Sequence, residues 1–386
     1  MDTPNFDYNL RLKTFLDNNA EHADLFFFPL SADLQYLTGI RREMPNFGAV
    51  LHPGMWIEGL WIAPNQPPVL ALPRMTAEFG GLGGPEGIAT HILGDHDDPT
   101  TLLENILEPF QLGDTPRIAI GDSTRGETVV GLNLKYPTAR YLSATALLSP
   151  QRRIKSAEEI AVLREAGRIT QAAFDALFEN LSFGVTELEV MQEVDYQLKV
   201  HGSKGPSFVT ALYCVGPKHE LIFGHAEQKW HRELQPPVSI LFDFGAILDG
   251  YCYDFGRTVF FGEPDPESVK VYETVLASQS AGVRALIPGK TAASADAAAR
   301  GVIEKAGYGP NFRHRLGHSI GLDVHEAPFL TASDETQLAE GMCFTVEPSI
   351  LRENALSARI EDIVVVGKRG GEKLTSTTDD IYIVES

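Results

Sequence analysis

The sequence predicts a protein of the mixed α/β class with two domains, at residues 1–150 and 151–386. Three observations support this prediction. The chain has 386 residues, which exceeds one typical domain and suits two. Its first part alternates strand-like and helix-like segments. Its second part contains a short internal sequence repeat, which is typical of two related halves.

The first domain is predicted to hold several short strands and helices. Ser31 is a suitable cap for a short helix that ends near Gly39. The glycine-rich stretch Gly80–Gly87 is not followed by a periodic helix, so we expect a loop there and no dinucleotide site. We expect this domain to shape a substrate site or to support oligomerisation. The expected strands are Leu25–Pro29, Ala49–His52, Trp56–Ile62, Val69–Leu72 and Arg117–Ile120.

Two capping boxes open the second domain. Ser156 and Glu159 form the first, at the start of an amphipathic helix that we expect to reach about Leu181. Thr186 and Glu189 form the second, before a helix that we expect to run to about residue 201. Polar caps at this spacing satisfy the free backbone N–H groups of a first helical turn.

The internal repeat consists of two short segments that each recur at nearly the same distance along the chain. Leu181–Thr186 resembles Leu286–Thr291, and Gly205–Phe208 resembles Gly309–Phe312. In both places the order is helix, Gly-x-Thr break, helix, Gly-Pro and a strand-like segment. This repetition predicts a pseudo-symmetric pair of αα-β halves with a cleft between them.

The stretch from Val238 to Phe261 is predicted to form a β-hairpin around Asp249-Gly250. In the register that this turn favours, Asp254 faces Gly245. Asp243 then lies on the same sheet face as Asp254, because side chains alternate along a strand. A register shifted by two residues would place the two carboxylates directly opposite each other. Two buried like charges are costly unless a cation lies between them, so the hairpin indicates a divalent metal.

Three more residues downstream of the hairpin could complete a metal site. His318 lies among small residues, and Glu347 and Glu361 end or enter apolar, β-branched segments. Each acid alone is equally well explained as a structural ion-pair partner. Together with Asp243 and Asp254, however, they supply four carboxylates and one imidazole, which suits two divalent ions better than one. Such ligands fit Mn²⁺, Co²⁺, Fe²⁺ or Zn²⁺.

The order and spacing of these residues resemble those of the metallopeptidases with the pita-bread fold, which include methionine aminopeptidase, aminopeptidase P and prolidase. The resemblance implies a pseudo-symmetric pita-bread (creatinase/aminopeptidase-like) domain preceded by a mixed α/β domain of the creatinase type. It is greatest for the proline-specific branch, since methionine aminopeptidases generally lack the first domain. The segments that carry it are Asp243–Gly245, Gly250–Thr258, Gly317–Gly321, His325–Glu326, Glu347–Pro348 and Arg359–Asp362.

The resemblance implies hydrolysis of the peptide bond between an N-terminal residue and proline, by water that two divalent ions activate. Manganese is the favoured ion. One ion would be held mainly by Asp243 and the other by His318 and Glu347, with Asp254 and Glu361 bridging the two. Glu347 would also accept a proton during catalysis. The substrate is thus a peptide with proline at its second position.

The resemblance also assigns supporting roles around the metals. His225 and His325 match catalytic histidines of the family, although either could be structural. His219 and Arg352 are weaker candidates for substrate contact. Arg359 lies two residues from Glu361, hence on the same face, where it can orient the carboxylates.

This sequence departs from the family pattern at three places. Ser349 replaces the usual glycine after Glu347-Pro348, and Ser319 follows His318 where glycine is common. The segment Ala327–Glu340 contains no lysine or arginine, although prolidases often place there a basic residue that holds the carboxylate of a dipeptide. Its absence argues against strict specificity for dipeptides.

Four alternatives remain beside an aminopeptidase P-like enzyme. A prolidase that acts strictly on dipeptides is the first. A non-catalytic peptide- or protein-binding module of the same fold typically loses metal ligands, as does the creatine-hydrolysing branch, and this chain keeps all five. A different two-metal hydrolase, such as a phosphoesterase, would have to be separated by its substrates.

Composition limits the compartment and the partners. The net charge of −20 argues against nucleic acid and anionic membranes as partners. Three scattered cysteines suit a reducing compartment, and the first residues lack the pattern of a signal peptide. We therefore expect a cytoplasmic protein, and the resemblance implies a homodimer.

Overall fold

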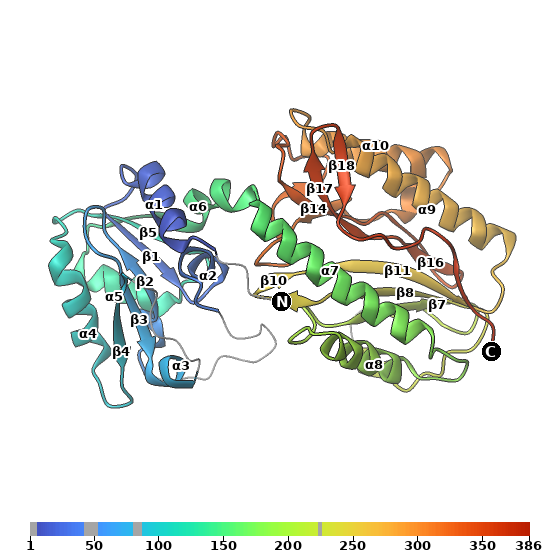
Figure 1. The fold of residues 1–386 in the computed structure, drawn as a ribbon, viewed down its shortest axis with the longest axis horizontal. Coiled ribbons are helices and arrows are strands. Elements are labelled where there is room, and N and C mark those ends of the chain that lie inside the picture. The colour runs from blue at the N-terminus through green and yellow to red at the C-terminus, as the bar shows by residue number, and fades with distance from the viewer. Residues whose placement is uncertain (1–5, 42–52, 80–86, 223–225) are drawn as a thin grey trace. The chain divides into compact units, whose positions relative to one another are not determined.

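The computed structural model describes residues 6–41, 53–79, 87–222 and 226–386, in two compact units (Figure 1). One unit ends at Arg152 and the other runs from Arg153 to Ser386. The sequence placed the domain boundary between residues 150 and 151. Within the described ranges, no helix is both long and apolar enough to cross a membrane.

The first unit is built on a mixed sheet with the strand order β4-β3-β2-β1-β5-β6. The central strand β1 is buried along its whole length and pairs antiparallel with β2 and parallel with β5. The strands are β1 (Leu25–Pro29), β2 (Gly59–Ile62), β3 (Val69–Pro73), β4 (Ala89–Leu93), β5 (Arg117–Ile120) and β6 (Arg140–Ser143). The helices are α1 (Tyr8–Asn19), α2 (Ala32–Thr38), α3 (Arg74–Phe79), α4 (Pro99–Leu107), α5 (Gly126–Lys135) and α6 (Ala144–Arg153), with short 3₁₀ turns at Met55–Ile57 and Glu108–Phe110.

Most elements expected in this unit are present, and one differs. The strand expected at Trp56–Ile62 begins only at Gly59, because Met55–Ile57 forms a 3₁₀ turn. The indole nitrogen of Trp61 donates a hydrogen bond back to the carbonyl of Ile57, which closes this turn against the strand. Ser31 caps α2 as predicted, by accepting a hydrogen bond from the backbone of Leu34. The expected strand at 49–52 and most of the loop at 80–87 lie outside the described residues.

The second unit contains two larger sheets, with the orders β19-β11-β8-β7 and β13-β12-β14-β17-β18. The first sheet comprises β7 (Ala211–Val215), β8 (Val238–Phe244), β11 (Phe255–Phe261) and β19 (Tyr382–Val384). The second comprises β12 (Gly317–Ser319), β13 (Glu326–Leu330), β14 (Cys343–Val346), β17 (Asp362–Gly367) and β18 (Gly370–Lys373). Two small hairpins are β9 (Ile247–Leu248) with β10 (Tyr251–Cys252), and β15 (Ser349–Arg352) with β16 (Leu356–Arg359).

Each of these sheets has its own pair of helices. The long helix α7 (Ala157–Phe178) packs Phe174 against Phe242 of β8 and Phe255 of β11, and it crosses that sheet in Figure 1. Its companion α8 (Glu187–Val200) contacts β7. Helix α9 (Pro266–Ala285) contacts β14 and β18, and α10 (Ala292–Lys305) contacts β13. Further 3₁₀ turns lie at Ala226–Gln228 and Gly309–Asn311.

Both predicted capping boxes are confirmed. The side chains of Ser156 and Thr186 accept hydrogen bonds from the backbone N–H groups of Glu159 and Glu189, whose carboxylates bond back to the caps. The helices end slightly earlier than expected, at Phe178 and Val200. The internal repeat also has a structural counterpart, since Thr186 and Thr291 each cap the second helix of a pair.

The central hairpin adopts the predicted register. Asp243 lies opposite Gly256 in the β8–β11 pair, and Leu248 lies opposite Tyr251 in the β9–β10 pair. Asp249 and Gly250 both have positive φ angles, of 51° and 84°, as a two-residue turn of type I′ requires. The register shifted by two residues is therefore wrong.

Candidate metal centre

A cavity of about 630 Å³ in the second unit collects the residues expected to bind metal. All five expected ligands line it, together with Arg359 and His325. They come from both large sheets and from the small β15–β16 hairpin region. The cavity is therefore lined by polar side chains from both pseudo-symmetric halves of the unit.

Three carboxylates form the centre of this site. Asp243 lies near the end of β8, Asp254 just before β11, and Glu361 just before β17. One ligand oxygen from each lies within 4.8 Å of those of the others. Backbone hydrogen bonds between Gly256 and Glu361, of 2.9 and 3.4 Å, join β11 to the entry of β17 and fix this approach.

His318 and Glu347 complete the group from β12 and from the end of β14. The Nε2 atom of His318 lies 3.4 Å from Oε1 of Glu347 and 3.6 Å from Oδ2 of Asp254. The Nδ1 atom of His318 lies 3.1 Å from the carbonyl of Ser319. If Nδ1 carries the proton, it donates a hydrogen bond to that carbonyl. The lone pair of Nε2 is then directed at two carboxylates. A lone pair facing carboxylates suits a ligand whose metal ion lies between them.

Within the described structure, the acids of this cluster have too few hydrogen-bond partners and too little nearby positive charge to balance their negative charges. Asp254 and Glu361 are 4% and 1% exposed, and Oδ1 of Asp254 and Oε2 of Glu361 have no hydrogen-bond partner among the described residues. Burial, followed by the charge of neighbouring carboxylates, raises the pKa of both groups well above the usual range. Burial also raises the pKa of Glu347 to about 7. Groups in this condition favour a bound cation, which the oxygen-rich donor set fits.

Arg359 supplies positive charge from within the protein. Its Nη1 lies 2.6 Å from Oδ2 of Asp243, 3.6 Å from Oε2 of Glu361 and 3.7 Å from Oε2 of Glu347. Burial alone would lower the pKa of Arg359, but these carboxylates, Asp243 first, raise it overall. This guanidinium contacts three of the acids, yet it balances only one of four negative charges.

Of the expected catalytic histidines, His325 lies in the cavity. Its ring centroid is 4.2 Å from that of His318, and the two rings are nearly perpendicular. Burial, assisted by His318 and then Arg315, lowers the pKa of His325 to about 4, so its neutral ring is the favoured form. His225 lies outside the described residues.

The two residues expected to contact substrate, His219 and Arg352, lie outside the described lining of the cavity. His219 is 2% exposed, and its Nε2 lies 3.0 Å from the carbonyl of Glu233, which fixes a loop. Arg352 pairs with Glu267 of α9 at 2.8 Å. Both side chains have structural partners that sequence spacing alone did not reveal.

The two serines that depart from the family pattern both hold neighbouring groups in place. The hydroxyl of Ser349 lies 2.5 Å from Nε2 of His314, which lines the cavity. Burial lowers the pKa of His314 to about 3, so its ring is neutral. The hydroxyl of Ser319 accepts a 3.3 Å hydrogen bond from the buried Lys155, which also pairs with Glu326 at 3.0 Å. Lys155 thus ties together the residues that follow His318 and His325.

Sequence reasoning missed several cavity residues. Tyr213 lies on β7, and Arg315 and His314 lie just before β12. The sequence did offer a signal for the last two, since they lie within three residues of the Gly-His motif at 317–318. No comparable signal marked Tyr213, because its place depends on the pairing of β7 with β8.

Gly317→Ala is expected to weaken metal binding by about 10- to 100-fold, as loss of a group that supports a ligand typically does. A Cβ at this position would lie 2.0 Å from the carbonyl oxygen of Thr345, so β12 must shift and carry His318 with it. Gly301→Ala in α10 is the matched control, because its Cβ meets open space. Competition with a chelating dye measures the affinity, and a folded Gly317→Ala protein with unchanged affinity would contradict the expectation.

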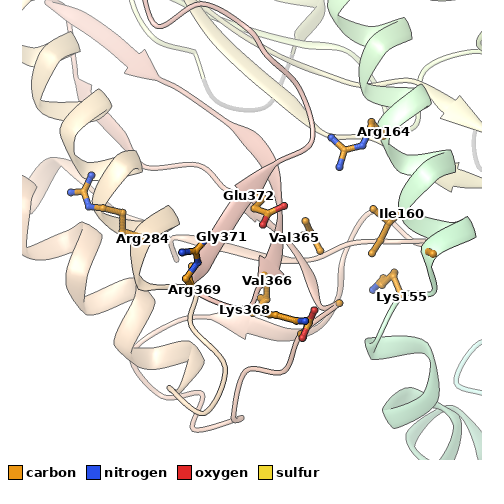
Figure 2. A pocket seen from close by; sticks show the side chains of 15 residues that line it. Lys155, Ile160, Arg164, Arg284, Val365, Val366, Lys368, Arg369, Gly371 and Glu372 are labelled. Carbon is orange, nitrogen blue, oxygen red and sulfur yellow. The ribbon is translucent and has the colours of Figure 1, made fainter.

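A second, larger cavity of about 980 Å³ shares no lining residue with the first. Figure 2 shows that Arg164 and Arg284 project from different helices on opposite sides of it. Its described lining includes Glu340 and Glu372 but no histidine, and it gathers no cluster of acids. The residues expected to bind metal therefore lie in the other cavity, which holds His318.

Comparison with known proteins identifies the family of this chain. The chain matches the model of metallopeptidase family M24 over residues 161–368. It is 34% identical to the putative dipeptidase YkvY of Bacillus subtilis, over 93% of this chain and 95% of that protein. It is 30% identical to an Xaa-Pro dipeptidase of Lactobacillus delbrueckii subsp. lactis, over 97% of this chain and 98% of that protein.

Solved structures show the same fold. A dipeptidase from Pyrococcus horikoshii OT3 superposes with a TM-score of 0.84 at 30% identity, covering 97% of this chain and all of that one. A prolidase from Thermococcus sibiricus gives a TM-score of 0.86 at 26% identity, covering 99% of this chain and all of that one. The expected pita-bread fold is confirmed, and the chain belongs to metallopeptidase family M24.

Proposed function

We propose that this protein is a two-metal peptidase that hydrolyses the bond between an N-terminal residue and proline. The observation that carries the proposal is the cluster of buried acids in one cavity, two of which keep an oxygen without a hydrogen-bond partner among the described residues. The relatives named Xaa-Pro dipeptidase support the choice of substrate.

In this proposal Asp243 would hold one ion, His318 and Glu347 would hold the other, and Asp254 and Glu361 would be shared by the two. When bound, such a pair of ions lowers the pKa of water and polarises the carbonyl group under attack. The convergence of the ligand atoms within one cavity supports the assignment. Manganese is the proposed ion, in keeping with the donor set of carboxylates and one imidazole.

The side chains around the ions have separate tasks. Glu347 accepts the proton of the attacking water, because its carboxylate lies in the cavity beside His318. His325, and His225 by the family resemblance, donate hydrogen bonds to the oxygen that becomes negative in the transition state. Arg359 keeps the carboxylates oriented. Proline has no N–H, so apolar residues such as Leu351 and Val324, which line the cavity, suit its ring.

We propose further that the protein acts in the cytoplasm as a homodimer, and that the unit ending at Arg152 shapes the substrate site or the dimer interface. Cys214, Cys252 and Cys343 are free and buried, which suits a reducing compartment. The resemblance to the Xaa-Pro branch supports the dimer.

A hydrolysis panel on EDTA-stripped protein tests the proposal. The substrates are Xaa-Pro dipeptides, Xaa-Pro-Yaa tripeptides, Met-Ala-Ser and a phosphodiester, each with and without added Mn²⁺, Co²⁺ or Zn²⁺. We expect no cleavage without metal and restored cleavage before proline with metal. Cleavage of tripeptides would establish an aminopeptidase P-like enzyme, and cleavage of dipeptides alone would establish a prolidase. Absence of peptide cleavage with every metal would refute the proposal.

A further inference from the structure

Arg315 is a cation in the metal cavity that has no anionic partner in the described part of the chain. It lies between α10 and β12 and lines the cavity together with His318 and His325. Its Nε atom is buried and has no hydrogen-bond partner among the described residues. The chain has 52 acidic and 32 basic residues, so acidic partners for ion pairs outnumber the basic side chains. An arginine left without one in an acid-rich protein is a candidate for binding an external anion.

The other arginines of the cavity are already paired. Arg359 holds Asp243 at 2.6 Å, and the exposed Arg313 holds Glu353 at 3.1 Å. Arg315 is the arginine that remains among the described lining residues, and its charge is available to whatever enters the cavity.

An aromatic ring fixes the position of this guanidinium. The central carbon of the Arg315 guanidinium lies 4.8 Å from the ring centroid of Phe329. Phe329 is the residue on β13 that pairs with His318 on β12. The ring thus supports the guanidinium beside a residue expected to bind metal, while the guanidinium N–H groups remain free to form paired hydrogen bonds with a carboxylate.

We propose that Arg315 binds a carboxylate group of the substrate, which gives the enzyme its preference among Xaa-Pro compounds. The proposal rests on the function proposed above and deepens it. Phe329 itself belongs to the segment Ala327–Glu340, which contains no lysine or arginine. Arg315 supplies positive charge to this side of the cavity from the neighbouring chain segment. The carboxylate is either the C-terminus of a dipeptide or the acidic side chain of the Xaa residue.

Three substrates distinguish these two sources in the metal-loaded, full-length protein: Leu-Pro, Leu-Pro-amide and Glu-Pro-amide. The variants are Arg315→Met, which keeps the contact with Phe329, and Arg315→Lys, which restores a charge. Arg313→Met is the control, because that arginine is exposed and already paired. Loss of charge-assisted hydrogen bonds predicts a rise in KM of about 10- to 100-fold in Arg315→Met, with kcat and metal content nearly unchanged. Arg315→Lys should recover part of the loss.

The pattern of losses identifies the source. A rise in KM for Leu-Pro but not for Leu-Pro-amide indicates the C-terminal carboxylate. A rise for Glu-Pro-amide but not for Leu-Pro indicates the acidic side chain. Three patterns in Arg315→Met would overturn the proposal: an unchanged KM for every substrate, an equal rise in KM for all three, or an equal rise for Leu-Pro and Leu-Pro-amide with none for Glu-Pro-amide. The same rises in KM in Arg313→Met would also overturn it.

A binding measurement separates this proposal from the proposed function. Calorimetric titration compares L-proline with L-prolinamide, and L-glutamate diamide with L-glutamate 1-amide, in the wild type and in Arg315→Met. Tighter binding of the carboxylate form in the wild type, lost in the variant, supports the role of Arg315 even if no peptide is cleaved. No preference for either carboxylate in the wild type would overturn it.

Discussion

Glu347→Gln is expected to lower kcat on an Xaa-Pro peptide by about 10²- to 10⁴-fold, the usual contribution of a positioned acid–base group. The side chain is 8% exposed, and its Oε1 lies 3.4 Å from Nε2 of His318. Glutamine keeps the shape of this side chain, and its amide oxygen can still accept the 3.2 Å hydrogen bond from Thr345. It cannot, however, accept a proton from water at neutral pH.

The matched control for this variant is Glu340→Gln, an exposed glutamate seven residues earlier that lies before β14, whereas Glu347 lies directly after it. Steady-state kinetics on a chromogenic Xaa-Pro substrate gives kcat, and metal analysis of the same sample shows whether the ions are retained. A loss of rate together with a loss of metal would assign Glu347 a role as ligand. A near-normal rate in a metal-loaded Glu347→Gln protein would contradict both roles.

Asp362→Asn is expected to lower the free energy of unfolding by about 3–5 kcal/mol, as removal of one partner from a buried ion pair does. Asp362 is fully buried and pairs with Arg257 at 2.7 Å, while Gln279 donates to its other oxygen at 2.8 Å. Arg257 is itself 1% exposed, so the variant leaves a buried guanidinium without its counter-charge. Urea denaturation followed by circular dichroism measures the change.

This loss should depend on pH in a defined direction. Burial alone would raise the pKa of Asp362, but Arg257 and Lys373 hold it below the ordinary value of an aspartate. A carboxyl group with a lower pKa in the folded state stabilises the fold above its unfolded pKa, and this contribution disappears as the pH falls through the folded pKa. The difference between wild type and Asp362→Asn should therefore be constant near neutral pH and shrink below about pH 4.

Asp379→Asn is the control for the stability measurement, because Asp379 contacts the same Lys373 at 3.3 Å but is half exposed. Surface pairs of this kind contribute little. If Asp362→Asn changed stability no more than Asp379→Asn, the buried pair would not be a major stabilising interaction.

Local signals in the sequence were sufficient for much of the fold. Asp249-Gly250 determined the register of the hairpin, because a two-residue turn with positive φ angles leaves the flanking strands one pairing. The caps at Ser156 and Thr186 located two helix starts, because their hydrogen bonds span only three residues. Trp56–Ile62 was misjudged, since an apolar composition does not distinguish a 3₁₀ turn from a strand.

Contacts between residues distant in sequence account for what was missed in the site. The ion pair of Arg352 with Glu267 joins β15 to α9, and no spacing rule anticipates it. The free guanidinium of Arg315 could not be told from its paired neighbour Arg313 without knowing where Glu353 lies. The convergence of Asp243, Asp254 and Glu361 was suggested by their unusual placement in strand-like sequence, but their separation depends on the bridge between Gly256 and Glu361.

That bridge has a consequence for how the enzyme is held together. Asp243 and Asp254 belong to the first half of the second unit, whereas His318, Glu347 and Glu361 belong to the second half. An ion shared by these residues would act as a cross-link between the halves. The affinity for the metal and the stability of the contact between the two halves are then thermodynamically linked. A substitution that weakens this contact therefore also lowers the metal affinity, even when it lies far from any ligand.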